Sequence, residues 1–111
     1  MLLSELLSLL KNNYTSKNFK DIEITGISYN STLTKKGDFF ICVKGESSDG
    51  HDFAQQAVEK GAEAIFCEKE LNINVPQIIV DDTKRKMALI AAKFYNEPSK
   101  EINLIGVTGT N

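Results

Sequence analysis

The sequence has 111 residues, of which 41% are hydrophobic and 25% charged, which is usual for one globular domain. The formal net charge of −2 argues against a nucleic-acid-binding protein, and no apolar run approaches the roughly 20 residues that span a bilayer. Two cysteines, Cys42 and Cys67, are too few for a disulfide scaffold. Because the first residues also lack the basic start of a signal peptide, these features favour a cytoplasmic protein without nucleic-acid or membrane partners.

The first third of the sequence predicts a helix, a polar loop and a short strand. In residues 2–12, leucines recur on one broad face, as in an amphipathic helix. Residues 13–20 are polar and predict a loop. Isoleucines in residues 22–27 predict a short strand, in which Gly26 marks a bulge or a turn. Residues 29–37 are again polar and rich in turn-forming residues.

Apolar runs in the middle of the sequence predict short strands that are buried on both faces, as in a parallel sheet. These runs occupy residues 39–43, 64–67 and 77–80. A helix between the first two completes a βαβ unit, and a second helix runs from residues 81–83 to about Tyr95, before Pro98. Residues 102–107 predict one more strand. The predicted fold class is therefore α/β, a small βαβ-containing sheet flanked by helices.

The helix between the first two buried strands has recognisable ends. Asp52 is predicted to cap its N-terminus, because a capping residue usually precedes the first apolar position. The apolar face of this helix is predicted to comprise Phe53, Ala57 and Val58. Gly61 is predicted to end it.

Residues 106–111, Gly-Val-Thr-Gly-Thr-Asn, follow the last predicted strand. A strand that runs into a glycine-rich turn is how a phosphate-binding loop begins, because glycines let backbone N–H groups approach phosphate oxygens. The full signature also requires Gly-Lys-[Ser/Thr] and a helix, which the printed sequence does not include. On spacing alone, an ordinary strand followed by a turn fits these residues equally well.

Several stretches taken together are similar to the N-terminal part of the Mur ligases. They are residues 34–45 (TKKGDFFICVKG), 49–53 (DGHDF), 57–62 (AVEKGA), 94–99 (FYNEPS) and 106–111 (GVTGTN). The resemblance implies that residues 1–101 form a domain that binds the UDP part of a UDP-N-acetylmuramoyl-peptide. It also implies that residues 102–111 are the first strand and incomplete P-loop of a central ATPase domain, which a C-terminal domain follows.

The resemblance is closest to the family member that adds a diamino acid, meso-diaminopimelate or L-lysine, to UDP-N-acetylmuramoyl-L-alanyl-D-glutamate. Such an enzyme uses ATP and Mg²⁺ to activate the substrate carboxylate, which the incoming amino group then attacks. The 111 residues alone are expected to be inactive and to bind neither cofactor. Two alternatives remain: the D-Ala-D-Ala-adding ligase of the same family, and a non-catalytic α/β interaction module. The module would be favoured if the 29–32 and 45–48 turns lay far apart in the fold.

The resemblance also implies a substrate site. An Asp-Ser-Arg element of the family, which contacts the uridine nucleotide, corresponds here to Asn30, Ser31 and Thr32, preceded by Tyr29. The Ser31 hydroxyl is expected to donate to a phosphate oxygen. Asn30 retains an acceptor without the charge, and Thr32 lacks the cation of the family pattern.

A second group of expected contacts follows the strand at residues 39–43. Lys44 is the nearby cation for a diphosphate, and backbone groups of the next turn are expected to contact uracil. The expected substrate contacts in this stretch are Lys44, Gly45, Glu46, Ser47 and Ser48, and the incomplete ATP-binding residues are Gly109, Thr110 and Asn111.

Structural roles compete with several of these assignments. Ser31 can satisfy a local turn, and Lys44 can be a solvated surface residue. His51 lies in a turn without partners at metal-ligand spacing, so a turn or capping role is favoured and no metal site is predicted. Asp81 and Asp82 precede a predicted helix and are expected to stabilise its N-terminus.

Overall fold

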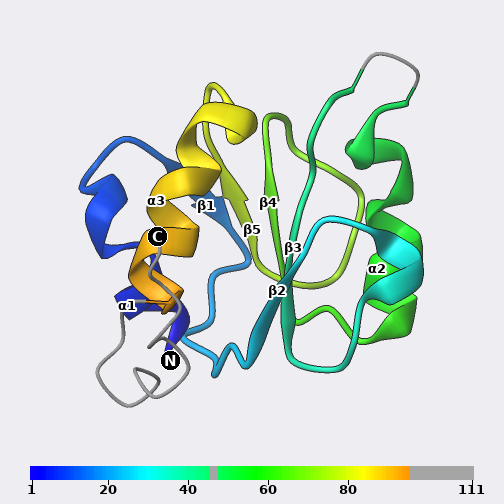
Figure 1. Cartoon of the computed structure of the whole chain (residues 1–111), viewed down its shortest axis with the longest axis horizontal. Helices are drawn as coiled ribbons and strands as arrows, with labels where there is room; N and C mark the ends of the chain where they lie inside the picture. Colours follow the sequence, from blue (N-terminus) through cyan, green and yellow to red (C-terminus); the bar gives the residue numbers. More distant parts are fainter. Residues whose placement is uncertain (46–47, 96–111) are drawn as a thin grey trace, which may run out of the picture.

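A five-stranded sheet runs through the middle of the molecule, with helices on both faces (Figure 1). The computed structural model describes residues 1–45 and 48–95. The strand order is β1-β5-β4-β3-β2; strands β2 to β5 are parallel, and β1 is antiparallel to β5. The strands are β1 (Thr15–Lys17), β2 (Gly26–Ser28), β3 (Asp38–Ile41), β4 (Ala64–Cys67) and β5 (Gln77–Ile79).

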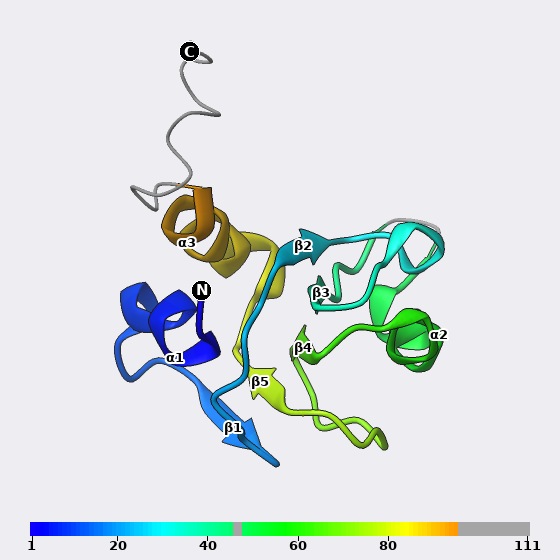
Figure 2. The same ribbon diagram turned by 90° about the horizontal axis from the view of Figure 1, so that it is seen from below.

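Helices α1 and α3 cover one face of the sheet, and α2 covers the other (Figure 2). The α-helices are α1 (Leu3–Leu6), α2 (Ala54–Lys60) and α3 (Thr83–Tyr95). Three short 3₁₀ turns are η1 (Ser8–Leu10), η2 (Ser31–Leu33) and η3 (Gly50–Phe53). The predicted α/β class, with a parallel βαβ unit formed by β3, α2 and β4, is confirmed. Within the described residues, no helix has the length and apolar character needed to cross a membrane.

The three apolar runs form strands because alternate side chains enter two separate cores. In β3, Phe39 and Ile41 pack toward α1 and α3, whereas Phe40 packs toward α2. In β4, Phe66 packs toward α1 and α3, whereas Ile65 packs toward α2. Burial on both faces explains why these strands read as continuous apolar runs.

The predicted helix over residues 2–12 is wrong in extent. Helix α1 ends at Leu6, the 3₁₀ turn η1 follows, and Lys11 adopts a positive φ of 57°. The leucine stripe is nonetheless buried as expected, through Leu3, Leu6, Leu7 and Leu10. Because so short a helix has little stability of its own, packing against the sheet determines its shape.

Two further expectations near the N-terminus are wrong. Part of the predicted loop 13–20 is strand β1, whose three residues are all exposed and therefore show no apolar pattern. The predicted strand 22–27 overlaps β2 only at its last two residues, since β2 runs from Gly26 to Ser28. Gly26 pairs with Asp38 as the first residue of that strand and marks neither a bulge nor a turn. A side chain at Gly26 would collide with Asp38, since a Cβ there would lie 2.5 Å from Asp38 Oδ1.

The start of the predicted middle helix also differs from expectation. Asp49, not Asp52, accepts the capping hydrogen bond, from the His51 N–H at 2.9 Å, and it caps η3. The turn η3 precedes α2, so Phe53 lies outside the helix and is 41% exposed. Ala54 takes its place in the core. Gly61 ends the helix as predicted.

Helix α3 begins where the sequence predicts, at Thr83, and within the described residues it extends to Tyr95. Asp82 accepts a hydrogen bond from the Arg85 N–H at 3.0 Å, which confirms its expected role at the helix N-terminus. The stop at Pro98, the strand 102–107 and the proposed domain boundary after residue 101 lie outside the described residues.

A buried glutamine links β5 to the loop before it. Gln77 is fully buried, its Oε1 accepts from the Leu71 N–H at 2.6 Å, and its Nε2 donates to the Leu71 carbonyl at 2.7 Å. We predict that Gln77→Leu lowers the free energy of unfolding by about 1–2 kcal/mol, because two backbone groups lose their partners. Gln55→Leu, at an exposed position, is the control and should change stability by less than about 0.5 kcal/mol. Equal losses in the two variants, measured by urea unfolding, would contradict this prediction.

Candidate functional site

A cavity of about 310 Å³ lies where β2 and β3 end and α2 begins. In open α/β sheets, ligands bind beyond the carboxyl ends of parallel strands, which is where this cavity lies. It is lined by Tyr29, Asn30, Ser31, Thr32, Val43, Ser48, Gly50, Phe53 and Gln56. The turn after β2 and Ser48 of the next loop, both predicted to contact substrate, therefore meet in one cavity.

The turn after β2 is held by its own side chains. The Asn30 Oδ1 accepts hydrogen bonds from the Thr32 N–H at 2.9 Å and the Thr32 Oγ1 hydroxyl at 2.7 Å, so Asn30 caps η2. Ser31 is buried, and its hydroxyl donates to the Gln56 Oε1 of α2 at 3.1 Å. The Ser31 hydroxyl is thus directed to α2, and its expected donation to a phosphate oxygen stays a prediction.

The loop after β3 depends on a close backbone approach at Gly50. The Gly50 N–H donates to the Val43 carbonyl at 2.9 Å. A Cβ at Gly50 would lie 2.6 Å from the Val43 nitrogen and 3.0 Å from the Cys42 Cα, too close for any side chain. Glycine at this position therefore allows the loop to close against the end of β3.

His51 fixes the same loop to the end of β4. It is buried, its Nδ1 lies 2.6 Å from Asp49 Oδ1, and its Nε2 accepts from the Glu68 N–H at 2.9 Å. Since Nε2 is an acceptor, Nδ1 carries the proton and donates to Asp49. Hydrogen bonds from the backbone N–H and the ring of His51 lower the pKa of Asp49. The predicted turn role of His51 is confirmed.

The Glu68 side chain continues this network to α3. Its Oε2 accepts from the Thr83 N–H at 2.8 Å, and the Thr83 hydroxyl donates to the Cys42 carbonyl at 2.6 Å. The segments that follow β3, β4 and β5 are therefore joined at one edge of the sheet. This arrangement gives the candidate site a rigid base.

Lys44 and Gly45 line a different cavity, of about 500 Å³, together with Glu68, Asp81, Asp82 and Lys84. Their side of the loop faces the N-terminus of α3 rather than the turn after β2. Of the remaining predicted contacts, Glu46, Ser47, Gly109, Thr110 and Asn111 lie outside the described residues.

The two cysteines are structural. Burial raises the pKa of the Cys42 thiol well above its usual range and that of Cys67 to about 11, so neither is a thiolate at neutral pH. Among the described residues, no cluster of three or more histidine, cysteine or carboxylate side chains could hold a metal ion.

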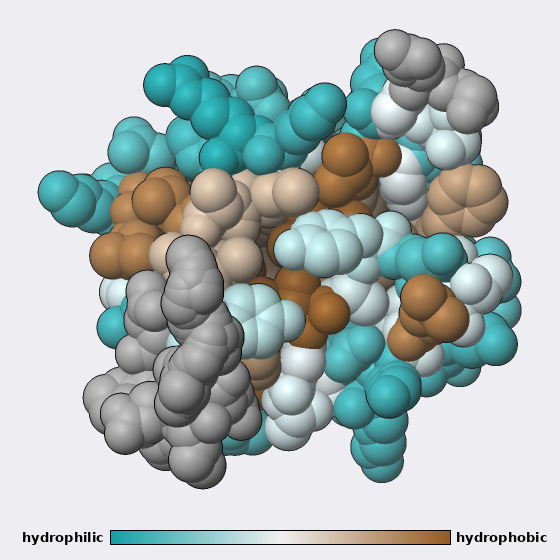
Figure 3. Space-filling model, viewed as in Figure 1, coloured by the Kyte–Doolittle hydropathy of each residue, from teal (hydrophilic) through white to brown (hydrophobic). Residues whose placement is uncertain are grey.

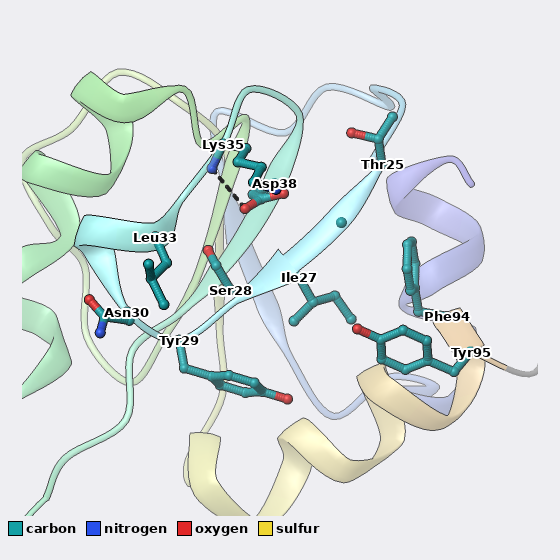
Figure 4. Close-up of a pocket in the computed structure, with 11 residues that line it drawn as sticks. Thr25, Ile27, Ser28, Tyr29, Asn30, Leu33, Lys35, Asp38, Phe94 and Tyr95 are labelled. Carbon is teal, nitrogen blue, oxygen red and sulfur yellow. Dashed lines mark hydrogen bonds between the residues drawn. The ribbon is translucent and has the colours of Figure 1, made fainter. Parts of the chain in front are cut away.

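A larger cavity of about 670 Å³ runs along β2, the edge strand, and reaches the end of α3. Figure 4 shows the rings of Tyr29 and Tyr95 on two sides of this cavity. At its far end, the backbone N–H of Lys35 donates to Asp38 Oδ2 at 2.9 Å. On the face in Figure 3, apolar side chains are exposed near the middle. Partial burial, and then the nearby Tyr29 and Asp38, raise the pKa of Tyr95. No sequence pattern indicated this cavity, because it depends on how α3 packs beside β2.

Residues 23–96 match the family model described as "Mur ligase family, catalytic domain". The chain belongs to the Mur ligase family. UDP-N-acetylmuramoyl-L-alanyl-D-glutamate–2,6-diaminopimelate ligase from Bacillus licheniformis is 47% identical over 111 residues, which are 100% of this chain and 23% of that protein. The ligase of the same name from Listeria monocytogenes serotype 4b is 45% identical over 100% of this chain and 22% of its own length. This Mur ligase chain thus spans about a quarter of these relatives.

Solved Mur ligase structures share the fold. MurF from Acinetobacter baumannii superposes with a TM-score of 0.70 at 24% identity, over 84% of this chain and 20% of that one. MurF ligase from Thermotoga maritima, in complex with ADP, has a TM-score of 0.58 at 33% identity, over 70% of this chain and 18% of its own. The likeness at 24% identity supports the fold alone.

Phe53 and Gln56 are cavity residues that the sequence did not indicate as such. Phe53 was assigned to the apolar face of a helix, and Gln56 had no assigned role. Both are brought to the cavity by the 3₁₀ turn before α2, which periodicity does not reveal.

Proposed function

We propose that this chain is the UDP-substrate-binding domain of a ligase that adds 2,6-diaminopimelate to UDP-N-acetylmuramoyl-L-alanyl-D-glutamate. The observation that carries the proposal is the 47% identity, over every residue of the chain, to a ligase named for that reaction. A full protein of this kind would contain the central ATPase and C-terminal domains and act in the cytoplasm. ATP and Mg²⁺ belong to the same proposal, and the expected ATP-binding residues Gly109, Thr110 and Asn111 are not among those described.

The alternatives receive less support. The D-Ala-D-Ala-adding ligase is matched through MurF structures, at 24% and 33% identity over parts of the chain. A non-catalytic module would be favoured if the two predicted turns lay far apart. Tyr29–Thr32 and Ser48 line one cavity, which speaks against the module, whereas Gly45 lines the cavity beside α3.

Within this proposal, the described residues bind and orient substrate and do not reach the reacting carboxylate. The cavity of about 310 Å³ is at the small end of the range for small-molecule pockets and suits one part of a nucleotide. Its lining combines amide and hydroxyl groups with the aromatic rings of Tyr29 and Phe53. Such a mixture fits a polar heterocycle attached to a sugar.

Titration of the chain with UDP tests the binding role. We expect chemical-shift changes in the amide spectrum at the residues that line the cavity, which are residues 29–32, Val43, Ser48, Gly50, Phe53 and Gln56. Strand β1, at the opposite edge of the sheet, is the internal reference and should not shift. Shifts spread evenly over the chain, or none at all near saturating UDP, would overturn the binding role.

The reaction is tested with the full-length protein from the same coding sequence. It should join diaminopimelate to the dipeptide substrate in an ATP-dependent manner and should not use D-Ala-D-Ala. Turnover with D-Ala-D-Ala alone would favour the rival ligase instead.

A further inference from the structure

The open edge of β2 carries an apolar surface that the described part of the chain leaves uncovered. Ile27, Tyr29, Leu33 and Tyr95 line the cavity of about 670 Å³ along this strand. Figure 4 shows Ile27 between the rings of Tyr29 and Tyr95. Leu33 is 69% exposed, and the two tyrosines are 48% and 52% exposed. Exposed apolar side chains that gather in one place, rather than singly, mark an interaction surface.

The backbone of β2 adds hydrogen-bonding groups to this surface. Among the described residues, no strand pairs with the outer side of β2. The Cys42 N–H donates to the Phe66 carbonyl of β4 at 2.9 Å, so the alternate residues of β3 that include Phe39 face β2. Ile27 is the register partner of Phe39, and only one residue of such a parallel pair bonds across. The Ile27 N–H and C=O therefore point to the open edge, which native proteins normally pair or cover.

The composition of this surface is that of the centre of a protein–protein interface. The charged side chains that line it, Lys35 and Asp38, lie at one end, and Asp38 is buried. Interface centres are poor in charge and rich in tyrosine. Because the Ile27 backbone groups also require hydrogen-bonding partners, the surface fits a polypeptide that presents apolar side chains together with polar groups.

The position of Tyr95 indicates which polypeptide this is. Tyr95 lines the cavity and is the last residue of α3, so the polypeptide leaves the helix at the rim of this surface. The ligase from Bacillus licheniformis is matched over 23% of its length, so most of the proposed full-length protein lies outside the 111 residues. A domain tethered beside a surface has a high effective concentration there, which favours it over a separate molecule.

We propose that the surface formed by Ile27, Tyr29, Leu33 and Tyr95 is the docking surface for the central domain of the full-length protein. The inference rests on the proposed function, which supplies that domain. Tyr29 also lines the cavity of about 310 Å³, so the docked domain lies directly beside the candidate substrate site. Docking along β2 thereby brings the ATP-dependent centre to a substrate whose reacting carboxylate the described residues do not reach.

Amide hydrogen exchange in the full-length protein tests the docking surface. The Ile27 N–H should exchange slowly, because the central domain covers it. Leu33→Asp places a charge in the contact and should speed exchange at Ile27 by about 10-fold or more, whereas Leu33→Met should leave it slow. Leu9→Asp is the matched control, because Leu9 is 43% exposed, belongs to η1 and does not line the cavity. Fast exchange at Ile27 in the unmodified protein, or an equal rate in Leu33→Asp, would overturn the inference.

Activity and oligomeric state separate this inference from its alternatives. Leu33→Asp should slow ligation by about 10-fold, because the two domains are misplaced, and leave the affinity for UDP nearly unchanged, because Leu33 does not line the substrate cavity. Protection of Ile27 that appears only as a dimer forms in sedimentation experiments would place a second copy on β2 and overturn the inference. Absence of UDP binding by the unmodified protein would overturn the proposed function. Fast exchange at Ile27 in a protein that binds UDP would overturn the docking surface alone.

Discussion

Gly61→Ala is expected to lower the free energy of unfolding by about 3 kcal/mol. Gly61 follows α2 with φ at +120°, a conformation that residues with a side chain rarely adopt. A Cβ there would also lie 2.6 Å from the Lys36 Cα and 2.8 Å from the Lys36 nitrogen. Backbone atoms cannot move aside as a flexible side chain can, so strain and collision add together.

The same substitution at Gly45 is the control. A Cβ at Gly45 would lie 3.5 Å from the Ser48 carbonyl oxygen, an ordinary contact, so Gly45→Ala should change stability by less than about 0.5 kcal/mol. Urea unfolding measures the free energy of unfolding of both variants. If that free energy depends on urea concentration with an unchanged slope, the folded state is the one affected. A Gly61→Ala protein as stable as the unmodified chain would show that the turn can rearrange.

The sequence predicts the centre of this fold better than its edges. Strands β3 and β4 are predictable because burial on both faces requires continuous apolar runs, and few other elements have that pattern. Strand β1 could not be predicted, because Thr15, Ser16 and Lys17 are exposed and the strand forms only by pairing with β5. The extent of α1 also depended on its contacts with the sheet.

The candidate site, too, could be predicted from the sequence only in part. The turn at residues 29–32 was found through its resemblance to a family motif, and the structure places it beside Ser48 in the cavity. The contact between Ser31 and Gln56 could not be predicted, since the two residues are 25 positions apart and no local pattern relates them. Phe53 was misassigned because helical periodicity was extended one residue too far, into the turn that Asp49 caps.

His51→Ala is expected to lower the free energy of unfolding by about 2–3 kcal/mol, because a buried side chain with two polar partners is removed. The Glu68 N–H would lose its acceptor, and Asp49 would lose the ring donor. Asp52→Ala is the neighbouring control: Asp52 is exposed, so its removal should cost less than about 0.5 kcal/mol. Urea unfolding at neutral pH compares the two variants.

The pH dependence of this network has a definite sign. The backbone N–H and then the ring of His51 hold the pKa of Asp49 below its ordinary value. A carboxylate with a lowered pKa stabilises the fold at pH values above its unfolded pKa, and this stability is lost as the pH falls through the folded pKa. In His51→Ala the ring bond is absent, so the Asp49 pKa should rise toward its ordinary value. Carboxyl titration by NMR measures this change, and an unchanged Asp49 pKa would contradict the assigned contact.

Removal of His51 should also weaken UDP binding, because the histidine holds the loop that carries Ser48 and Gly50. His51 and its partners Asp49 and Glu68 do not line the cavity. Removal of the His51 ring would therefore change UDP binding only through the position of the loop. The affinity for UDP should thus fall in His51→Ala and stay unchanged in the control Asp52→Ala, whose side chain is exposed. An unchanged affinity for UDP in a folded His51→Ala protein would show that UDP binding does not depend on the position of this loop.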